Sequence, residues 1–298
     1  MTYTIKEQLI ILLLNGSGYS VLSRYLKAIT SNHQLHQKLN LYEIRKTVDR
    51  IYEYSNLKKR IHINLDPTFY HQLADLTIQA IMIGESEYPI LWYEIYKPPI
   101  IFFYRGDLSL LSKPKVSVIG TRKITTNGKN MTQLIIDAFS KKQWVAVSGL
   151  ALGIDAQVHQ SAINHPNGKT IAIIPCGLNY YYPKANQSIQ HQLEKHHLIL
   201  SEYLPNAKPH KHQFIERNRL VAGIAKASVV IEAAQKSGSL ITANYALQCN
   251  RELFVLPGRI TDQQSMGCLE LIEAGASPII NINKLVNDIE QIFQYQGY

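Results

Sequence analysis

The sequence has few of the features that hold together small secreted, metal-bound or membrane proteins. Its 298 residues include three cysteines, Cys176, Cys249 and Cys268, and no C-x-x-C pair. Neither a disulfide framework nor a zinc knuckle is indicated, so we expect buried free thiols. The longest early apolar run, Leu9 to Leu14, is too short to span a bilayer, and a signal peptide's basic start and cleavage site are missing. These absences predict a cytoplasmic protein without a membrane segment.

The motifs that bind nucleotide cofactors or metals are incomplete. Gly120-Thr121-Arg122 follows a predicted strand, but Arg122 stands where the dinucleotide fingerprint requires its second glycine. Gly168-Lys169-Thr170 is similar to the end of a P-loop, yet it leads from helix into strand and position 163 is Ile. Histidines pair at 196–197 and 210–212 without a carboxylate or cysteine at a supporting spacing. We therefore expect no cofactor and no metal.

Positive charge is in excess and unevenly placed. The chain has 31 Lys and Arg against 22 Asp and Glu, a net charge of +9. Residues 1–112 hold 12 basic and 10 acidic residues, and the remainder holds 19 basic and 12 acidic residues. A basic surplus favours an anionic partner, although charge alone does not separate nucleic acid from an acidic membrane surface.

The first third of the chain differs from the rest. Apolar periodicity predicts helices up to Leu14, from the turn at 15–18 to Ile29, and from Leu41 to Tyr54. We expect a small helical domain at 1–65, followed by a connecting segment at 66–112, rich in Pro and aromatic residues, that packs on the main sheet. A helix, glycine turn, helix hairpin can bind DNA backbone or simply pack, and both interpretations remain open.

Short apolar runs alternate with helix-like sequence in residues 113–298. The runs KVSVI, WVAVS, TIAIIP, LILSEY, SVVIEA and ELFVLP have strand length. Helices are expected near 127–142, 185–195, 214–225, 238–249 and 268–275, and another carries Asp155 and His159. This alternation predicts an α/β fold with a doubly wound, mostly parallel sheet.

Small polar residues gather where the predicted strands end. Ligands of open α/β sheets bind at this edge, where loops and helix N-termini meet. The loop and anion-binding candidates are Gly120, Thr121, Ser148, Gly149, Gly153, Gly177, Ser237, Gly238 and Ser239.

Aromatic and basic side chains occur together in two segments near that edge. Phe214, Arg217, Asn218 and Arg219 begin one predicted helix, and Tyr180-Tyr181-Tyr182-Pro183-Lys184 follows a strand. Rings beside cations suit stacked bases and phosphates. The alternative is a solvated helix start with Phe214 in the core, and the residues alone do not decide between the two.

Several runs in register resemble the bacterial DNA-processing family DprA, also called Smf. They include VIGTR, SGLALGIDAQVH, TIAIIPCGLNYYYPKAN and FIERNRLVAGIAKASVVIEAAQKSGSLITA, and the match covers about residues 80–280. Ile215 and Asn250 depart from the residues that the family usually has there, as does Leu269. These departures affect local loop shape rather than the assignment.

The resemblance implies a fold, a function and a set of contact residues. It implies an extended Rossmann-like domain that binds single-stranded DNA, dimerises and loads RecA recombinase onto strands coated by single-strand binding protein during natural transformation. No catalytic activity is expected. The implied DNA contacts are Arg122, Lys184, Phe214, Arg217, Asn218 and Arg219. The implied dimer region contains Met266, Leu269, Leu271 and Ile272.

A second hypothesis keeps the same sheet and changes the ligand. The chain would be a nucleotide-binding sensor, or an enzyme similar to the nucleoside monophosphate phosphoribohydrolases. That function requires a catalytic carboxylate in a closed pocket, and Glu232 beside Ser237 to Ser239 is the candidate. Asp155 and His159, which share a helix face, could also form an acid/base pair, but no nucleophile accompanies them.

Overall fold

The computed structural model describes residues 2–30, 38–55, 63, 73, 75–77 and 79–295. The chain forms two compact units, one of residues 1–86 with 99–103 and one of residues 87–98 with 104–298. The predicted division into 1–65, 66–112 and 113–298 stays a prediction. Its first boundary, at residues 65 and 66, lies outside the described residues.

The first unit is mainly helical, as predicted. It contains α1 (Ile5–Leu14), α2 (Tyr19–Thr30) and α3 (Leu41–Glu53). Thr4 with Glu7 and Asn40 with Glu43 form capping boxes that satisfy the first amides of α1 and α3. Two short pairings were not predicted: β1 (Thr2–Tyr3) with β2 (Leu39–Asn40), and β3 (Ala80–Met82) with residues 101–103 of β4 (Ile101–Gly106), both antiparallel.

The second unit contains the predicted parallel sheet. Its strands are β5 (Lys115–Ile119), β6 (Val145–Ser148), β7 (Lys169–Ile174), β8 (Leu198–Ser201), β9 (Ala227–Val230), β10 (Glu252–Val255) and β11 (Ser277–Pro278). They lie in the order β11-β10-β9-β5-β6-β7-β8, and neighbours are parallel. The chain builds outward from β5 to β8 and then crosses to β9, so a topological switch point lies between β5 and β9.

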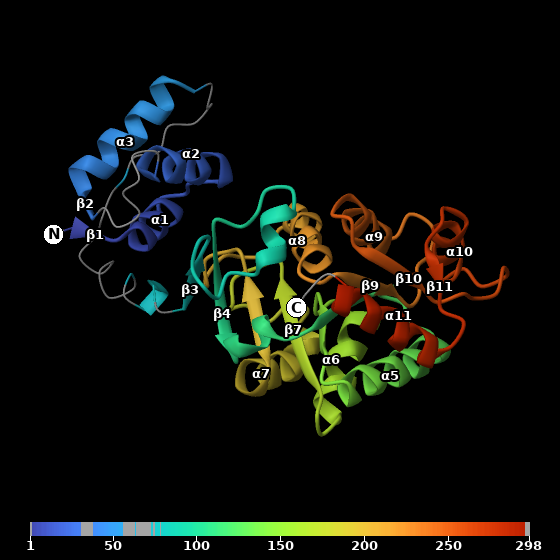
Figure 1. The fold of residues 1–298 in the computed structure, drawn as a ribbon. Helices are drawn as coiled ribbons and strands as arrows, with labels where there is room; N and C mark the ends of the chain where they lie inside the picture. Colours follow the sequence, from blue (N-terminus) through green and yellow to red (C-terminus); the bar gives the residue numbers. More distant parts are fainter. Residues whose placement is uncertain are drawn as a thin grey trace. The chain divides into compact units, whose positions relative to one another are not determined.

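Helices cover both faces of this sheet (Figure 1). On one face lie α5 (Thr126–Lys141), α6 (Ile154–Asn164), α7 (Gln187–His196) and α11 (Ile282–Tyr295), and on the other α8 (Lys211–Gly223) and α9 (Gly238–Gln248). The unit also contains α10 (Met266–Glu273) and the 3-10 turns η1 (Ile90–Glu94), η2 (Leu108–Ser112) and η3 (Lys184–Asn186). The doubly wound α/β fold is confirmed, although α8 begins three residues earlier than expected and α11 was not predicted.

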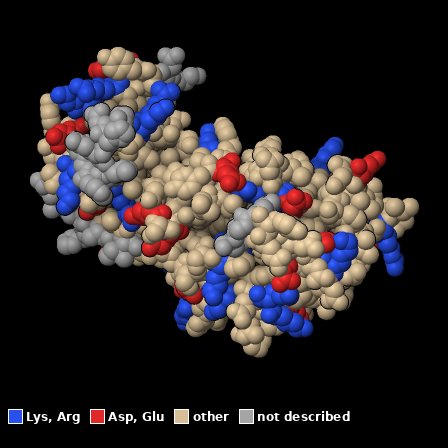
Figure 2. Space-filling model, in the orientation of Figure 1, with Lys and Arg blue, Asp and Glu red and all other residues tan. Residues whose placement is uncertain are grey.

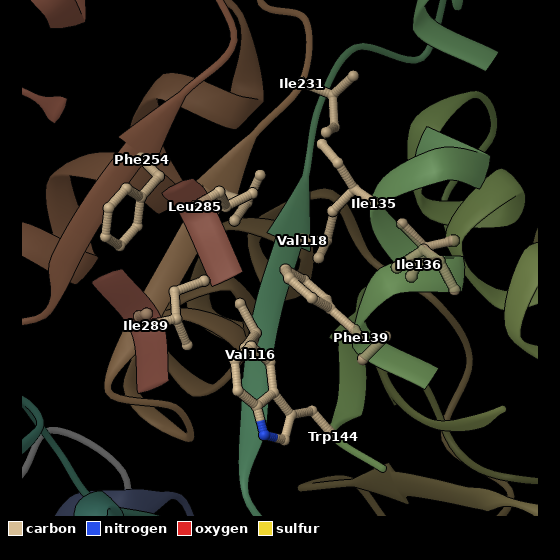
Figure 3. Packing of buried hydrophobic residues seen from close by; sticks show 14 of the residues in the cluster. Val116, Val118, Ile135, Ile136, Phe139, Trp144, Ile231, Phe254, Leu285 and Ile289 are labelled. Atoms are coloured by element: carbon tan, nitrogen blue, oxygen red, sulfur yellow. The ribbon is translucent and has the colours of Figure 1, made fainter. Parts of the chain in front are cut away.

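A buried apolar cluster fixes the helices on the α5 face. Val116 and Val118 point from β5 toward α5 and α11, as Figure 3 shows. Between them on the strand, Ser117 points the opposite way and donates to the carbonyl of Val221 in α8, at 2.6 Å. Alternation along one strand therefore builds an apolar layer on one face and satisfies a buried hydroxyl on the other.

The η1 turn is anchored on the second unit through a buried arginine and a tryptophan. Trp92 donates its indole N–H to the carbonyl of Leu220 at 3.1 Å. Arg251, which is buried, pairs with Glu94 at 2.6 Å and donates to the carbonyl of Leu91 at 3.0 Å. Residues 87–98 thus pack on α8 as part of this unit.

The cysteine prediction is confirmed, because all three thiols are free and buried. Burial raises the pKa of Cys176 to about 11 and that of Cys268 to about 12. In the described part of the chain, no three His, Cys, Asp or Glu side chains are grouped to hold a metal ion. No described helix is both long and apolar enough to cross a membrane.

Two neighbouring residues of α5 test the packing of the cluster. Ile135 is fully buried, whereas Leu134 is 50% exposed. Ile135→Ala should lower the free energy of unfolding by about 2–5 kcal/mol, because it leaves a cavity in the core. Leu134→Ala, which removes the same number of carbon atoms, should change it by no more than about 0.5 kcal/mol. Denaturant titration of both variants measures this, and equal losses would contradict the packing described.

Candidate nucleic-acid interface

A pocket of about 520 Å³ opens at the switch point. Its lining comes from the loops that follow β5, β6 and β9, and from α8, α9 and the segment after β10. The lining residues from the loop candidates are Gly120, Thr121, Gly149, Ser237, Gly238 and Ser239, and those from the DNA-contact candidates are Arg122, Phe214, Arg217 and Asn218. Part of the strand-end cluster predicted from sequence therefore lines one cavity, and its binding of a ligand stays a prediction.

Arg122 lies exposed at the mouth of this pocket. The loop that carries it is held in place, because Thr121 donates its N–H to the carbonyl of Glu232 at 2.7 Å and its hydroxyl to Gln264 at 2.6 Å. Gly120 has no room for a side chain, since a Cβ would overlap Ile154. The backbone is thus fixed while the guanidinium remains accessible.

Two aromatic rings lie beside that guanidinium. The Arg122 guanidinium carbon is 5.7 Å from the centre of the Phe214 ring, within cation–π range. Tyr182, which is 42% exposed, meets Phe214 edge to face at 5.3 Å between ring centres. Arg122 and Tyr182 are exposed and Phe214 is half-buried. The three side chains form a cluster, here called the Arg122 cluster. A smaller cavity of about 50 Å³ adjoins it, next to Leu152 and Pro183.

Arg217 has a different position from Arg122. It is 5% exposed, and its Nη1 donates to the carbonyls of Gly149 and Ile173, each at 2.5 Å. Burial lowers the pKa of Arg217, and the nearby Asp155 carboxylate opposes that shift. A Cβ at Gly149 would overlap the guanidinium, so a larger residue there would displace Arg217 from this position. Arg217 therefore ties the ends of β6 and β7 to α8.

Arg219 is also buried within the protein. Its Nη2 donates to both carboxylate oxygens of Glu202, at 2.7 and 2.8 Å, and Nη1 donates to the carbonyl of Glu216 at 3.3 Å. Burial raises the pKa of Glu202, and Arg219 opposes that shift. Contact of DNA with Arg217 or Arg219 stays a prediction, and both guanidiniums already have hydrogen-bond partners within the protein.

The remaining candidates lie outside the pocket lining. Lys184 is exposed in η3, two residues after Tyr182. Ser148 is buried and donates to the carbonyl of Val118 at 2.7 Å. Gly153 precedes α6 with φ of 80°, and Gly177 is buried against Leu204 and Pro205.

The N-terminus of α9 opens into the pocket without a side-chain cap. Ser237 occupies the N-cap position, but its hydroxyl accepts no hydrogen bond from the first turn. Among the described residues, its oxygen is buried and has no hydrogen-bond partner. An uncapped helix start offers backbone amides and a positive dipole end, which favours an anion.

Glu232 has a structural contact rather than an open position. It is 5% exposed, accepts from the Thr125 amide at 3.0 Å and also accepts from the Thr125 hydroxyl. Thr125 in turn caps α5 by accepting from the Gly128 amide at 3.0 Å. Both carboxylate oxygens thus brace the start of α5, and the pocket is lined by Asp155 instead.

Sequence reasoning missed several lining residues. Lys123, Gln263 and Gln264 also border the pocket. Lys123 adjoins Arg122, and the two glutamines follow β10, so position after a strand would have identified them. The strand order that brings the segment after β10 close to β5 could not be read from local sequence.

A family model and two known proteins match most of this chain. The model of the DNA recombination-mediator protein A family matches residues 79–290. The DNA processing protein DprA of Bacillus subtilis is 39% identical over 220 residues, which are 73% of this chain and 74% of that protein. DprA of Streptococcus pneumoniae is 41% identical over 211 residues, 71% of this chain and 74% of that protein.

Two solved structures are also similar. DNA processing protein A from Streptococcus pneumoniae superposes with a TM-score of 0.79 at 32% identity, covering 96% of this chain and 98% of that one. DNA processing protein A from Helicobacter pylori, described for its single-stranded DNA binding mode, gives a TM-score of 0.65 at 34% identity. It covers 72% of this chain and 96% of its own.

His159, on α6 behind the pocket, makes stability depend on pH. Thr170 donates its hydroxyl to the carbonyl of Ala146 at 2.7 Å, so His159 donates from Nδ1 to Thr170 at 2.8 Å and stays neutral. Burial lowers the pKa of His159 to about 3. Below about pH 6.5 the unfolded chain gains a proton that the folded chain does not, so stability should fall by about 1.4 kcal/mol per pH unit down to about pH 3.

The substitution His159→Leu should remove that part of the pH dependence. We expect the slope of unfolding free energy against pH, measured by urea titration between pH 4 and 6.5, to flatten by about 1.4 kcal/mol per unit. His196→Leu, at an exposed position, controls for the loss of a histidine. A slope unchanged by His159→Leu would show that this side chain is not held neutral.

Proposed function

The chain belongs to the DNA recombination-mediator protein A family, and from this premise we propose that it binds single-stranded DNA at the switch-point pocket. The proposal takes its ligand from the described binding mode of the Helicobacter pylori relative. The proposed location rests on the exposed basic and aromatic side chains at the pocket of this chain. The chain would act as a DNA-binding protein without catalytic activity.

The Arg122 cluster carries the proposal. An exposed guanidinium pairs bidentately with phosphate, and exposed rings stack on unpaired bases. Arg122 offers the guanidinium, and the rings are exposed Tyr182 and half-buried Phe214. The guanidinium carbon is 5.7 Å from the centre of the Phe214 ring, which is 5.3 Å from the centre of the Tyr182 ring. Duplex DNA keeps its bases stacked on each other, so this combination favours a single strand.

The pocket behind the cluster would receive the phosphate chain. The uncapped start of α9, with Ser237 to Ser239, supplies amides for one phosphate, and the exposed ammonium of Lys123 lies on the same lining. Exposed Lys184 would extend the cationic track beyond Tyr182. Arg217 and Arg219 would act by positioning the loops rather than by meeting the strand.

The enzymatic alternative has less support. A phosphoribohydrolase-like reaction needs a carboxylate that can reach the substrate. Both oxygens of Glu232 are engaged by Thr125, and Asp155 is buried beside Arg217 with its pKa raised by burial. These contacts favour structural roles for the two carboxylates.

We also propose that two copies associate through α10 and act on RecA during natural transformation. Leu271 is buried, whereas Met266, Leu269 and Ile272 remain partly exposed on this short helix. A two-fold contact of this kind would be self-complementary. Sedimentation should give the mass of a dimer, and a monomer mass that does not depend on concentration would contradict this proposal.

The proposed action on RecA has a separate test. Added protein should shorten the lag before RecA assembles on DNA strands coated by single-strand binding protein. A lag that added protein leaves unchanged would contradict it.

Substitutions at the rim test the binding site. Arg122→Ala and Lys184→Ala should each weaken binding of poly(dT) and flatten its salt dependence, by about 0.7 in log-log slope per lost phosphate contact. Phe214→Leu should lower affinity by roughly 1–3 kcal/mol without changing the slope, because it removes stacking and no charge. Fluorescence anisotropy over a range of salt concentrations measures both quantities.

A matched control separates a local contact from general charge. Lys141 is exposed at the end of α5, at the opposite rim of the sheet from Lys184. Lys141→Ala should leave affinity and slope close to those of the unsubstituted chain. If all three cationic variants fold normally and behave alike, the strand does not bind at the switch point.

A further inference from the structure

The first unit has a groove of its own between α2 and α3, with a volume of about 540 Å³. Its lining is drawn from both helices and from β2. The described residues that line it are Arg24, Ala28, Ile29, Leu39, Glu43, Lys46, Thr47, Arg50, Ile51 and Tyr54. The groove lies wholly within this unit and shares no residue with the switch-point pocket.

Positive charge dominates the walls. Arg24, Lys46 and Arg50 are exposed, and none of them forms an ion pair with another described residue. Glu43 is the acidic member, and its carboxylate accepts from the Asn40 amide at 2.8 Å in the cap of α3. Lys and Arg side chains are prominent on the part of this unit that Figure 2 displays. The groove therefore presents cations whose charge the described protein does not neutralise.

The floor of the groove is apolar but closed. Ile29 and Leu39 are each 6% exposed and Ile51 is 9% exposed. The exposed apolar surface belongs instead to Tyr54 at the end of α3, which is 88% exposed. A helical peptide that docks in a groove needs open apolar pockets for its anchor residues, and this floor offers little such surface.

We infer that this groove is a second nucleic-acid contact, which holds the phosphate backbone of a single strand. Two guanidiniums and an ammonium supply phosphate partners, and a fully presented tyrosine ring supplies a stacking surface. An acidic protein segment could pair with the three cations, but the Tyr54 ring would then have no stacking partner. The closed floor would also offer no pockets for apolar anchor residues. The cation and ring combination therefore favours the nucleic acid.

Paired substitutions in the full chain test the inference. Lys46→Ala with Arg50→Ala removes two groove cations from α3. Lys27→Ala with Lys38→Ala removes the same charge from exposed residues of this unit outside the groove lining. We expect the groove pair to lower affinity for long poly(dT) several-fold and to flatten the salt slope by about 0.7 per lost contact, and the control pair to do neither.

The same comparison is made in the Arg122→Ala background, where an independent groove should give the same fold loss. Thermal unfolding checks each variant, and Lys46→Gln with Arg50→Gln repeats the test with residues that keep helix propensity. Equal effects of the two pairs, or no effect of either, would overturn the inference. So would binding of poly-glutamate that is lost in the groove pair while poly(dT) binding is unchanged, which would assign the groove to an acidic protein.

Discussion

A buried guanidinium ties together the strand ends that border the switch-point pocket. Arg217 reaches from α8 to the carbonyls of Gly149 and Ile173, at the ends of β6 and β7. Placing that charge in the interior is costly unless it is hydrogen-bonded and paired, and Asp155 supplies the opposing charge. The requirement extends to Gly149, where any side chain would overlap the guanidinium. The shape of the pocket thus depends on one buried cation and its partners.

The cations at the carboxyl ends of the strands differ in their surroundings. Arg217 and Arg219 are engaged by carbonyls and by Glu202, whereas Arg122, Lys123 and Lys184 are exposed to solvent. Glu232 similarly braces the loop of Arg122 through Thr125. A rigid inner layer can thereby present accessible charges in a fixed position, and a preorganised site loses less entropy when a ligand binds.

Local sequence predicted much of the fold and part of the lining of the candidate site. Strands such as KVSVI and SVVIEA were recognised because buried parallel strands are continuous apolar runs. α11 was missed although Leu285, Ile289 and Phe293 repeat at helical spacing. Its packing could not be read from the sequence, because the Phe293 ring meets the Trp144 ring, at 5.1 Å between ring centres, only in the folded chain. The burial of Arg217 and Arg219 could not be predicted from the sequence. A basic residue has the same sequence signal whether its guanidinium pairs with a carboxylate such as Glu202 or faces solvent.

The position of a bound single strand is the central test of the proposed site. The most direct measurement is a crystal structure of the full chain with bound poly(dT). We expect a phosphate between Arg122 and the first turn of α9, and a base against Phe214 or Tyr182. The Arg217 guanidinium should make no contact with the DNA. DNA bound at the amino ends of the β-strands, away from Gly120 and Ser237, would contradict the proposed site.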